Sequence, residues 1–330
     1  MKKFAMVGMT LAVAAVFVLS GPFQTQASAQ QPIVMKLASA NPVGDIKDLV
    51  SLKMAELVKQ KTNGRVIVEV YSGGQLGDWR EAIEGLGLGV TQIVIESVGT
   101  IEPYTKMALI ETVPYLFDDI DQFQKVWLGP LGRKMLDAIG DDGNFKILSP
   151  MNRGARVVTS KKPFTNLAEL KGLKIRVPNM TMYISTWKAL GAAPMPLALT
   201  EVFTALQQNT VEAQENPTIE SYGHSFYDVC QYLVETDHLF GADVFFFNKQ
   251  YFEKLPADIQ KAIIEACDEA AAWRNKETLA KEAEFKKMFE AKGVKIIKPE
   301  RAEFAAACAK IVEQEYPYLL DWFKEIKALR

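Results

Sequence analysis

From residue 33 onward, short apolar runs that predict strands alternate with segments whose apolar residues recur every three or four positions, which predicts helices. In the first half the predicted order is strand, helix, strand, helix, strand, over residues 33–38, 45–61, 65–71, 78–86 and 91–95. We expect Asn63-Gly64 to end the first helix, and Asp78 followed by Glu81 predicts a capping box at the start of the second. The alternation is typical of an α/β layer with a largely parallel sheet.

The same alternation restarts in the second half, after a helix over 119–139 that we expect to be interrupted near Pro130. Strands are predicted over 145–149, 156–160, 173–177, 195–198, 211–215 and 243–248, with helices over 167–171, 180–190 and 201–208. A helical pattern then runs over 257–291 without an internal Pro or Gly. At 1.5 Å per residue this helix would be on the order of 50 Å long, so we expect it to brace two domains.

The first 29 residues indicate an export signal. Lys2 and Lys3 precede a run without a charged residue over 4–19, and the small-residue triplet Ala27-Ser28-Ala29 follows. This pattern predicts a secretory signal peptide cleaved after Ala29, because the run is shorter than the roughly 20 apolar residues that span a membrane. The first cysteine is Cys230, so no lipid anchor is expected at the new N-terminus.

These patterns divide the chain into five parts. They are the signal peptide (1–29), α/β domain I (30–152 together with about 243–256), α/β domain II (153–242), the long bracing helix (257–291) and C-terminal helices that pack on the domains (292–330). Each α/β half is long enough to bury a core of its own.

Composition excludes several classes of protein. The 330 residues carry 38 Lys and Arg against 40 Asp and Glu, so there is no basic field to attract nucleic acid. Two histidines, and three cysteines without metal-ligand spacing, leave little for metal or acid–base chemistry. Gly85, Gly87 and Gly89 follow a helix and precede a strand, which is the reverse of a dinucleotide-binding loop. We therefore expect neither a metal nor a cofactor.

Polar side chains at the carboxyl ends of predicted strands are the candidates for a ligand site. Arg176 lies near the end of one such strand, Asn216 follows a second, and Glu96 follows a third in the other half of the chain. Ligands of open α/β sheets bind outside these strand ends. A guanidinium there offers a planar, permanently charged fork for a carboxylate. Strand ends from both halves predict a ligand held in a cleft between two domains.

Six motifs occur in order along nearly the whole chain after residue 30. They are Tyr71-Ser-Gly-Gly-Gln-Leu-Gly-Asp78, Ile95-Glu96-Ser97, Gly154-Ala-Arg156, Lys171-Gly-Leu-Lys-Ile-Arg-Val-Pro-Asn179, Pro194-Met-Pro-Leu-Ala-Leu-Thr-Glu-Val-Phe-Thr-Ala-Leu206 and Val211-Glu-Ala-Gln-Glu-Asn-Pro217. Together they resemble the solute-binding proteins of TRAP transporters, the DctP family. The resemblance implies a periplasmic binding protein fold, in which two α/β domains with a long domain-spanning helix close over an organic acid. It also implies a monomer in the periplasm that delivers the acid to membrane permease subunits driven by an ion gradient.

The resemblance assigns roles to single residues. Arg176 would be the principal carboxylate clamp, Arg156 a second cation near the same carboxylate, and Asn216 a hydrogen-bonding partner that fixes the orientation of the carboxylate. Glu96 and Asn179 match positions that reach the remaining polar groups of the ligand.

Three further acids belong to the predicted site. Asp78 matches a more peripheral family position, and Glu220 and Asp243 fall at positions that line the cleft in relatives, where acids are unusual. With Glu96, the acids Glu220 and Asp243 predict an acidic side opposite the arginines, which would suit hydroxyls or an ammonium group. In the alternative, Glu220 points to solvent on the turn after Pro217.

Three positions depart from the sialic-acid-binding members of the family. Ala40 and Gly99 stand where those members carry polar or cationic side chains, and Leu199 replaces an aromatic ring. These departures argue against sialic acid as the ligand. Tyr183 and Trp187 lie at helical spacing and are expected in the core rather than in the pocket.

The sequence thus predicts a binding protein without catalytic activity, specific for a small carboxylate-bearing solute. A hydroxy acid, a sugar acid, a dicarboxylate and an amino acid derivative all remain open, and the acids opposite the arginines favour the first two. A binding module of a chemoreceptor or sensor kinase is one alternative, which the sequence does not separate from transport. An exported α/β hydrolase or oxidoreductase is another, but the sequence lacks the nucleophile–base or cofactor constellation that it would need.

Overall fold

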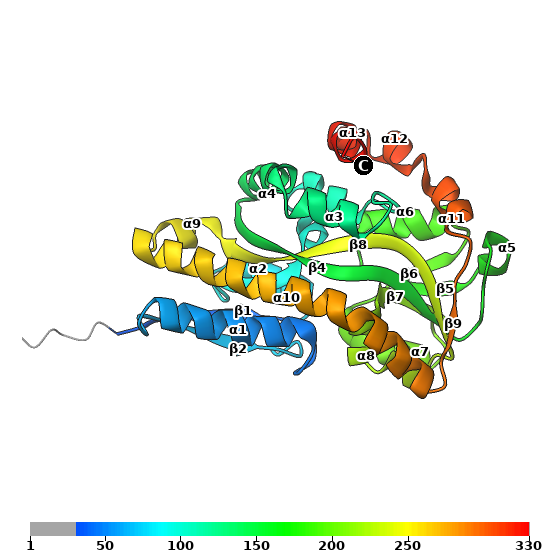
Figure 1. Ribbon diagram of the computed structural model, residues 1–330, viewed down its shortest axis with the longest axis horizontal. Coiled ribbons are helices and arrows are strands. Elements are labelled where there is room, and N and C mark those ends of the chain that lie inside the picture. Colours follow the sequence, from blue (N-terminus) through cyan, green and yellow to red (C-terminus); the bar gives the residue numbers. More distant parts are fainter. Residues whose placement is uncertain (1–30, 330) are drawn as a thin grey trace, which may run out of the picture. The chain divides into compact units, whose positions relative to one another are not determined.

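Strands from both halves of the chain join in one mixed sheet (Figure 1). The computed structural model describes residues 31–329, so the predicted signal peptide and its cleavage after Ala29 lie outside the described residues. The strands found within them are β1 (Ile33–Ala38), β2 (Val66–Tyr71), β3 (Ile93–Ser97), β4 (Phe145–Ser160), β5 (Lys174–Val177), β6 (Ala193–Pro196), β7 (Ala213–Pro217), β8 (Tyr232–Asn248) and β9 (Lys295–Ile297). Their order in the sheet is β2-β1-β3-β8-β4-β7-β5-β6, with β9 beside β8.

The sheet is parallel toward its two ends and antiparallel in its centre. β1 pairs in parallel with β2 and β3, and β5 pairs in parallel with β6 and β7. In the centre, β8 is antiparallel to β3 and β4, and β4 is antiparallel to β7. The prediction of a largely parallel sheet is therefore right for the outer strands and wrong for the two long strands that connect them.

The central strands β4 and β8 are longer than the sequence predicted. The strands predicted over 145–149 and 156–160 are the two ends of β4, and the strand predicted over 243–248 is only the last part of β8. Polar residues such as Arg153 and His238 interrupt the apolar pattern in mid-strand, yet both are buried. Each forms a hydrogen bond with a side chain from another element, which a local sequence pattern does not reveal.

The predicted border between domains I and II falls inside both central strands. Asn152 and Ala242, the residues at the two borders, face each other in the β4–β8 ladder. From Pro32 onward the described chain forms one compact unit. The division into two domains therefore stays a prediction, and any movement between them would have to bend this pair of strands.

Helices cover both faces of the sheet (Figure 1). The α-helices in the described residues are α1 (Ile46–Lys61), α2 (Trp79–Gly87), α3 (Ile120–Trp127), α4 (Pro130–Gly143), α5 (Leu167–Leu170), α6 (Thr181–Ala189), α7 (Val202–Gln207), α8 (Thr218–Gly223), α9 (Lys249–Glu253), α10 (Ala257–Ala291), α11 (Arg301–Cys308), α12 (Ile311–Glu315) and α13 (Leu320–Lys327). Short 3-10 helices are η1 (Val98–Ile101), η2 (Lys106–Thr112), η3 (Leu199–Glu201), η4 (Phe226–Asp228) and η5 (Pro317–Leu319).

Local signals explain where several helices begin and end. Asp45 caps α1 by accepting a hydrogen bond from the amide of Lys47, and Asn63 and Gly64 take positive φ angles just after the helix, as predicted. The segment predicted over 119–139 is two helices, and the second begins at Pro130. The capping box predicted at Asp78 is wrong, because that side chain precedes α2 without making a capping hydrogen bond.

Consecutive phenylalanines in β8 show how the two faces are filled. Phe245 and Phe247 belong to a cluster with residues of α1, α9 and α10, whereas Phe246 belongs to a cluster with residues of α2, α3 and α4. The side chains alternate because successive residues of a strand point to opposite faces. Both faces of β8 are therefore buried at this point.

The long helix α10 spans the residues predicted for it and lies beside α1 (Figure 1). Ile259 and Ile263 near its start pack in one cluster with residues of α1 and β1. Phe289 near its end packs instead with Val157 of β4 and Leu233 of β8. The helix thus contacts the core on both sides of the predicted domain border.

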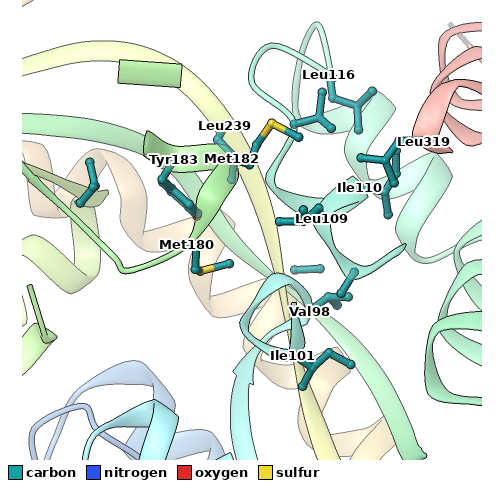
Figure 2. Packing of buried hydrophobic residues seen from close by; sticks show 14 of the residues in the cluster. Val98, Ile101, Leu109, Ile110, Leu116, Met180, Met182, Tyr183, Leu239 and Leu319 are labelled. Carbon is teal, nitrogen blue, oxygen red and sulfur yellow. The ribbon is translucent and has the colours of Figure 1, made fainter. Parts of the chain in front are cut away.

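The larger hydrophobic cluster reaches the region where polar strand ends meet. Figure 2 shows Met180 and Tyr183 beside Met182, with Val98, Ile101 and Leu109 across the cluster. Leu319, from the C-terminal segment, packs into the same cluster. None of the helices in the described residues combines the length and the apolar character that crossing a membrane requires.

Gly99 leaves no room for a side chain where β3 passes into η1. A Cβ atom there would lie 2.4 Å from Thr112 Cγ2, 2.7 Å from Met180 Cε and 2.9 Å from Glu111 Oε2. We expect Gly99→Ala to lower the free energy of unfolding by about 1–3 kcal/mol, the usual effect of overpacking a core. Urea titration followed by circular dichroism measures this change.

Gly87→Ala is the matched control, because nothing lies within 4 Å of the Cβ that it would add at the end of α2. Its unfolding free energy should stay the same or rise by up to about 1 kcal/mol. Equal stability of the two variants would contradict the close packing described at Gly99.

Candidate ligand-binding site

A cavity lies at the carboxyl ends of β3, β5 and β7, the place where polar strand ends were predicted to meet. Six charged side chains line it: Lys47, Glu96, Arg153, Arg156, Arg176 and Glu220. The remaining lining residues are Trp79, Ser97, Thr100, Pro178, Met180, Tyr183, Leu199 and Asn216. The cavity thus has a strongly charged wall and a smaller apolar part.

Arg176 is a buried cation that forms no ion pair within the described chain. It comes from β5 and is only 2% exposed. Its Nε and Nη2 donate hydrogen bonds to the carbonyl oxygen of Leu197, at 3.0 and 2.7 Å. Among the described residues, no carboxylate lies within 4 Å of its guanidinium nitrogens. Burial lowers the pKa of Arg176 to about 10, although Glu215 favours the charged form.

Arg156 also lines the cavity, but its charge is already balanced. Its Nη2 donates to Glu215 Oε1 at 2.8 Å, its Nε donates to Glu215 Oε2, and the Tyr183 ring lies 5.0 Å from its guanidinium carbon. Burial alone would raise the pKa of the Glu215 carboxyl, but Arg156 and His238 outweigh it and hold that pKa below its usual range. Arg156 therefore offers a ligand less net charge than Arg176 does.

A β-bulge brings Arg153 to the same cavity as Arg156. Residues three apart in a regular strand point to opposite faces. Between Asn152 and Ala155, however, β4 advances three positions while β8 advances two, and Gly154 takes a φ of 84°. The extra residue reverses the alternation, so both guanidinium groups line one cavity.

Lys47 projects from α1 into the cavity wall and binds several acids. Its Nζ lies 3.0 Å from Glu96 Oε2, 3.4 Å from Asp243 Oδ1 and 3.9 Å from Glu220 Oε1. Burial would lower the pKa of Lys47, but these carboxylates raise it above its usual value. Lys47 is therefore a permanent cation inside the wall.

The acids predicted to form a negative side are neutralised. Glu220 accepts hydrogen bonds from Arg153 Nη2, the closest at 3.0 Å, and Asp243 accepts one from Arg274 Nη2 at 2.6 Å. Glu220 is only 2% exposed, so the alternative in which it faces solvent is wrong. Asp243 is fully buried behind the lining residues. The expectation of an acidic side suited to an ammonium group is corrected, because each acid has a cation beside it.

A simple pairing summarises the charges of the site. Lys47 is offset by Glu96, Arg153 by Glu220, Arg156 by Glu215 and Arg274 by Asp243. Arg176 alone is left over among these cations. The site is therefore balanced for one additional negative charge.

Asn216 is held in place by its neighbours on β7 and α8. Its Nδ2 donates to Gln214 Oε1 at 2.8 Å, and Gln214 Nε2 in turn donates to Thr159 Oγ1 and Ser221 Oγ. This chain of bonds leaves Asn216 Oδ1 and the second amide hydrogen available to the cavity.

Three of the predicted site residues lie outside the lining of the cavity: Asp243, described above, and also Asn179 and Asp78. Asn179 lies in an adjacent cleft that shares Trp79 and Met180 with the cavity, and its carbonyl accepts a hydrogen bond from Arg80 Nη2 at 3.0 Å. Asp78 is half-buried just before α2; its Oδ1 is buried without a hydrogen-bond partner among the described residues, and desolvation raises its pKa.

Sequence reasoning missed Lys47 and Arg153. Arg153 directly precedes the motif Gly154-Ala-Arg156, but a regular strand would point it away from Arg156. Lys47 lies in the first turn of an ordinary amphipathic helix. Tyr183 was expected in the core, and it packs there while also lining the cavity. The described part of the chain has no group of three His, Cys, Asp or Glu side chains placed to hold a metal ion.

Comparison with known proteins gives a consistent result. Residues 37–317 match the family described as bacterial extracellular solute-binding protein, family 7 (DctP). A solute-binding protein of Verminephrobacter eiseniae is 34% identical over 79% of this chain and 78% of its own length.

Solved TRAP periplasmic solute-binding proteins are similar in structure as well. The protein from Roseobacter denitrificans with bound L-galactonate has a TM-score of 0.85 and 28% identity, over 90% of this chain and 99% of its own. The protein from Pseudomonas putida with bound D-glucuronate has a TM-score of 0.86 and 28% identity, over 90% of this chain and 97% of its own. These findings confirm the resemblance stated from the six motifs and the predicted α/β fold class.

Asp45 makes the stability of the site region depend on pH. Its Oδ1 caps α1, while its Oδ2 is buried without a hydrogen-bond partner among the described residues. Burial, and next the charge of Glu220, raise its pKa to about 7. The folded state therefore keeps a proton that the unfolded chain releases at lower pH. The contribution of protonated Asp45 to the free energy of unfolding is present below about pH 4 and is lost as the pH rises through 7.

We expect Asp45→Asn to remove this loss, because the amide keeps the capping oxygen and stays uncharged. Between pH 5 and pH 8 the unfolding free energy of the variant should fall less than that of the unmodified chain, by on the order of 2 kcal/mol. Urea titrations at the two pH values measure the difference. Asp142→Asn, at an exposed position, is the control and should follow the unmodified chain. Identical pH profiles for all three proteins would contradict the buried, protonated Asp45.

Proposed function

This chain belongs to the bacterial extracellular solute-binding proteins of family 7, and we propose that it captures a small carboxylate-bearing organic acid at Arg176. The observation that carries the proposal is the buried guanidinium of Arg176, which has no carboxylate partner among the described residues. A hydroxy acid, a sugar acid or a similar solute fits this requirement. Binding alone is proposed, without catalysis.

The energetics of Arg176 favour an anionic ligand. A buried cation without a counterion is unfavourable, because the protein interior replaces its hydration poorly. The carbonyl of Leu197 takes Nε and one hydrogen of Nη2, so Nη1 and the other hydrogen of Nη2 remain. These donors form the end of the planar fork, which can hold both oxygens of a carboxylate.

Arg156 and Asn216 are proposed to assist rather than to supply the main charge. Arg156 is committed to Glu215, so it adds a favourable field and rigidity beside Arg176. Asn216 has a free oxygen and a free amide hydrogen, and its orientation is fixed by Gln214. Such prearranged donors do not have to be reoriented when the ligand binds.

The solved relatives support a hydroxylated acid. The proteins with bound L-galactonate and D-glucuronate hold acids that carry several hydroxyl groups. In this chain, Ser97, Thr100 and Glu96 add hydroxyl and carboxylate groups to the cavity lining. We propose that they reach the part of the ligand that Arg176 does not hold.

We further propose that the exported chain acts in the periplasm as a monomer and delivers its acid to TRAP membrane permease subunits. Family membership and the TRAP relatives support this proposal. It is distinguished from a sensory role by deleting the gene and measuring uptake of a labelled acid that the purified protein binds. Loss of uptake is expected. Normal uptake with a lost chemotactic or transcriptional response would favour the sensory alternative.

Arg176→Ala should weaken binding of the acid by about 3 kcal/mol, roughly two orders of magnitude in Kd, because the bound carboxylate loses its charged partner. Isothermal titration with D-glucuronate and L-galactonate measures the change. Arg133→Ala, at an exposed Arg133–Asp137 pair, is the matched control and should bind as the unmodified chain does. Undiminished affinity in Arg176→Ala would refute the carboxylate clamp.

A further inference from the structure

The cavity wall around Lys47 contains a donor and an acceptor that the protein itself does not use. Arg153 donates to Glu220 through Nε and Nη2, and within residues 31–329 its Nη1 donates to no acceptor. Glu96 accepts from Lys47 Nζ and from the amide of Ser97 through Oε2, which leaves its Oε1 without a partner in the described chain. Arg153 and Glu96 both line the cavity and are more than nine-tenths buried.

This wall carries no excess charge, in contrast to the part of the cavity at Arg176. Lys47 is paired with Glu96, and Arg153 is paired with Glu220. Asp243 Oδ1, which lies 3.2 Å from Arg153 Nε and 3.4 Å from Lys47 Nζ, belongs to the same cluster, and its charge is offset by Arg274. Burial opposes ionisation of Glu220, but Arg153 and Lys47 outweigh it and hold its pKa below the usual range. Glu220 therefore stays ionised, and the charge of Arg153 is already offset before a ligand enters.

A wall with a free donor and a free acceptor but no net charge selects among functional groups. A hydroxyl group can both donate and accept, so it can satisfy either atom without adding charge. A second carboxylate only accepts, and it would bring a negative charge toward the unpaired oxygen of Glu96 in poorly screened surroundings. An alkyl chain would bury both polar atoms without a hydrogen-bond partner.

We propose that Arg153 and Glu96, positioned by Glu220 and Lys47, form a hydroxyl-reading subsite that makes the cavity prefer a polyhydroxy monocarboxylate to a dicarboxylate of the same length. Arg153 Nη1 donates to one ligand hydroxyl and Glu96 Oε1 accepts from another. This assignment rests on the proposed function, in which Arg176 holds the single carboxylate. Glu220 acts indirectly, through Arg153. It neutralises the charge of Arg153, so Arg153 does not serve as a second carboxylate clamp.

Three six-carbon acids test the selectivity of the unmodified protein. L-galactonate has one carboxylate and a hydroxylated chain, galactarate has the same chain with a second carboxylate, and hexanoate has no hydroxyl. In isothermal titration, the Kd values of galactarate and hexanoate should each be at least about tenfold higher than the Kd of L-galactonate. This is the usual effect of one unmatched buried polar or charged group. Galactarate or hexanoate binding as tightly as L-galactonate would overturn the subsite.

Two variants assign the selectivity to residues. Glu220→Gln keeps the size of the side chain and removes its charge, so Arg153 gains an excess positive charge. The preference for L-galactonate over galactarate should then shrink by about tenfold or more. Arg153→Lys keeps the charge but loses the planar fork. This variant should raise the Kd of L-galactonate by about tenfold, whereas the Kd of hexanoate stays the same.

Glu284→Gln, on the exposed face of α10, is the control. It should leave the ratios between the Kd values of the three acids unchanged. Circular dichroism establishes that each variant is folded. The assignment would be overturned if folded Glu220→Gln kept the preference of the unmodified protein for L-galactonate over galactarate. It would also be overturned if Arg153→Lys weakened the binding of all three acids equally. If Glu220→Gln does not fold, the three-acid comparison on the unmodified protein decides.

Arg176→Ala separates this inference from the proposed function. If this variant binds all three acids more weakly, and the unmodified protein shows no preference among them, the carboxylate clamp is supported and the hydroxyl subsite is wrong. If Arg176→Ala binds the acids as tightly as the unmodified protein, both assignments fall.

Discussion

A charge that is moved from water into a protein interior needs an opposite charge within a few ångströms, because the interior replaces its hydration poorly. In this protein several cations meet that requirement around one cavity. Their ion pairs join different elements: α1 to β3, β4 to α8, β4 to β7, and α10 to β8. Such pairs contribute little net stability, but removing one partner leaves a buried charge without its counterion, which is strongly unfavourable. The ligand site follows from the one exception, Arg176.

The two long central strands make this arrangement possible. β4 and β8 run through the middle of the sheet and carry charged residues in segments buried on both faces. The bulge at Gly154 then directs Arg153 and Arg156 to the same cavity. Without the bulge, one of the two guanidinium groups would lie on the opposite face. A small irregularity of the backbone therefore determines the charge pattern of the cavity wall.

Balance and imbalance of charge have different consequences in the two parts of the cavity. At Arg176 we propose that the uncompensated charge supplies affinity for an anion, because the ligand would provide the counterion that the described chain lacks. At Arg153 and Glu96 the charges are compensated, and the role proposed for their unused hydrogen-bonding atoms is selectivity among uncharged groups. Two solved relatives, with bound L-galactonate and D-glucuronate, hold acids with several hydroxyl groups.

The sequence by itself determined the order of the helices and most strands, the long helix over 257–291, the family, and five of the eight predicted site residues: Arg176, Arg156, Asn216, Glu96 and Glu220. These features depend on local periodicity or on motifs at strand ends, which are visible along the chain. Only the tertiary structure decided that β4 and β8 are continuous, that Lys47 and Arg153 line the cavity, and that Glu220 and Asp243 are neutralised. The physical reason is that a charge's role depends on its neighbours in space, and these neighbours come from elements far apart in the sequence.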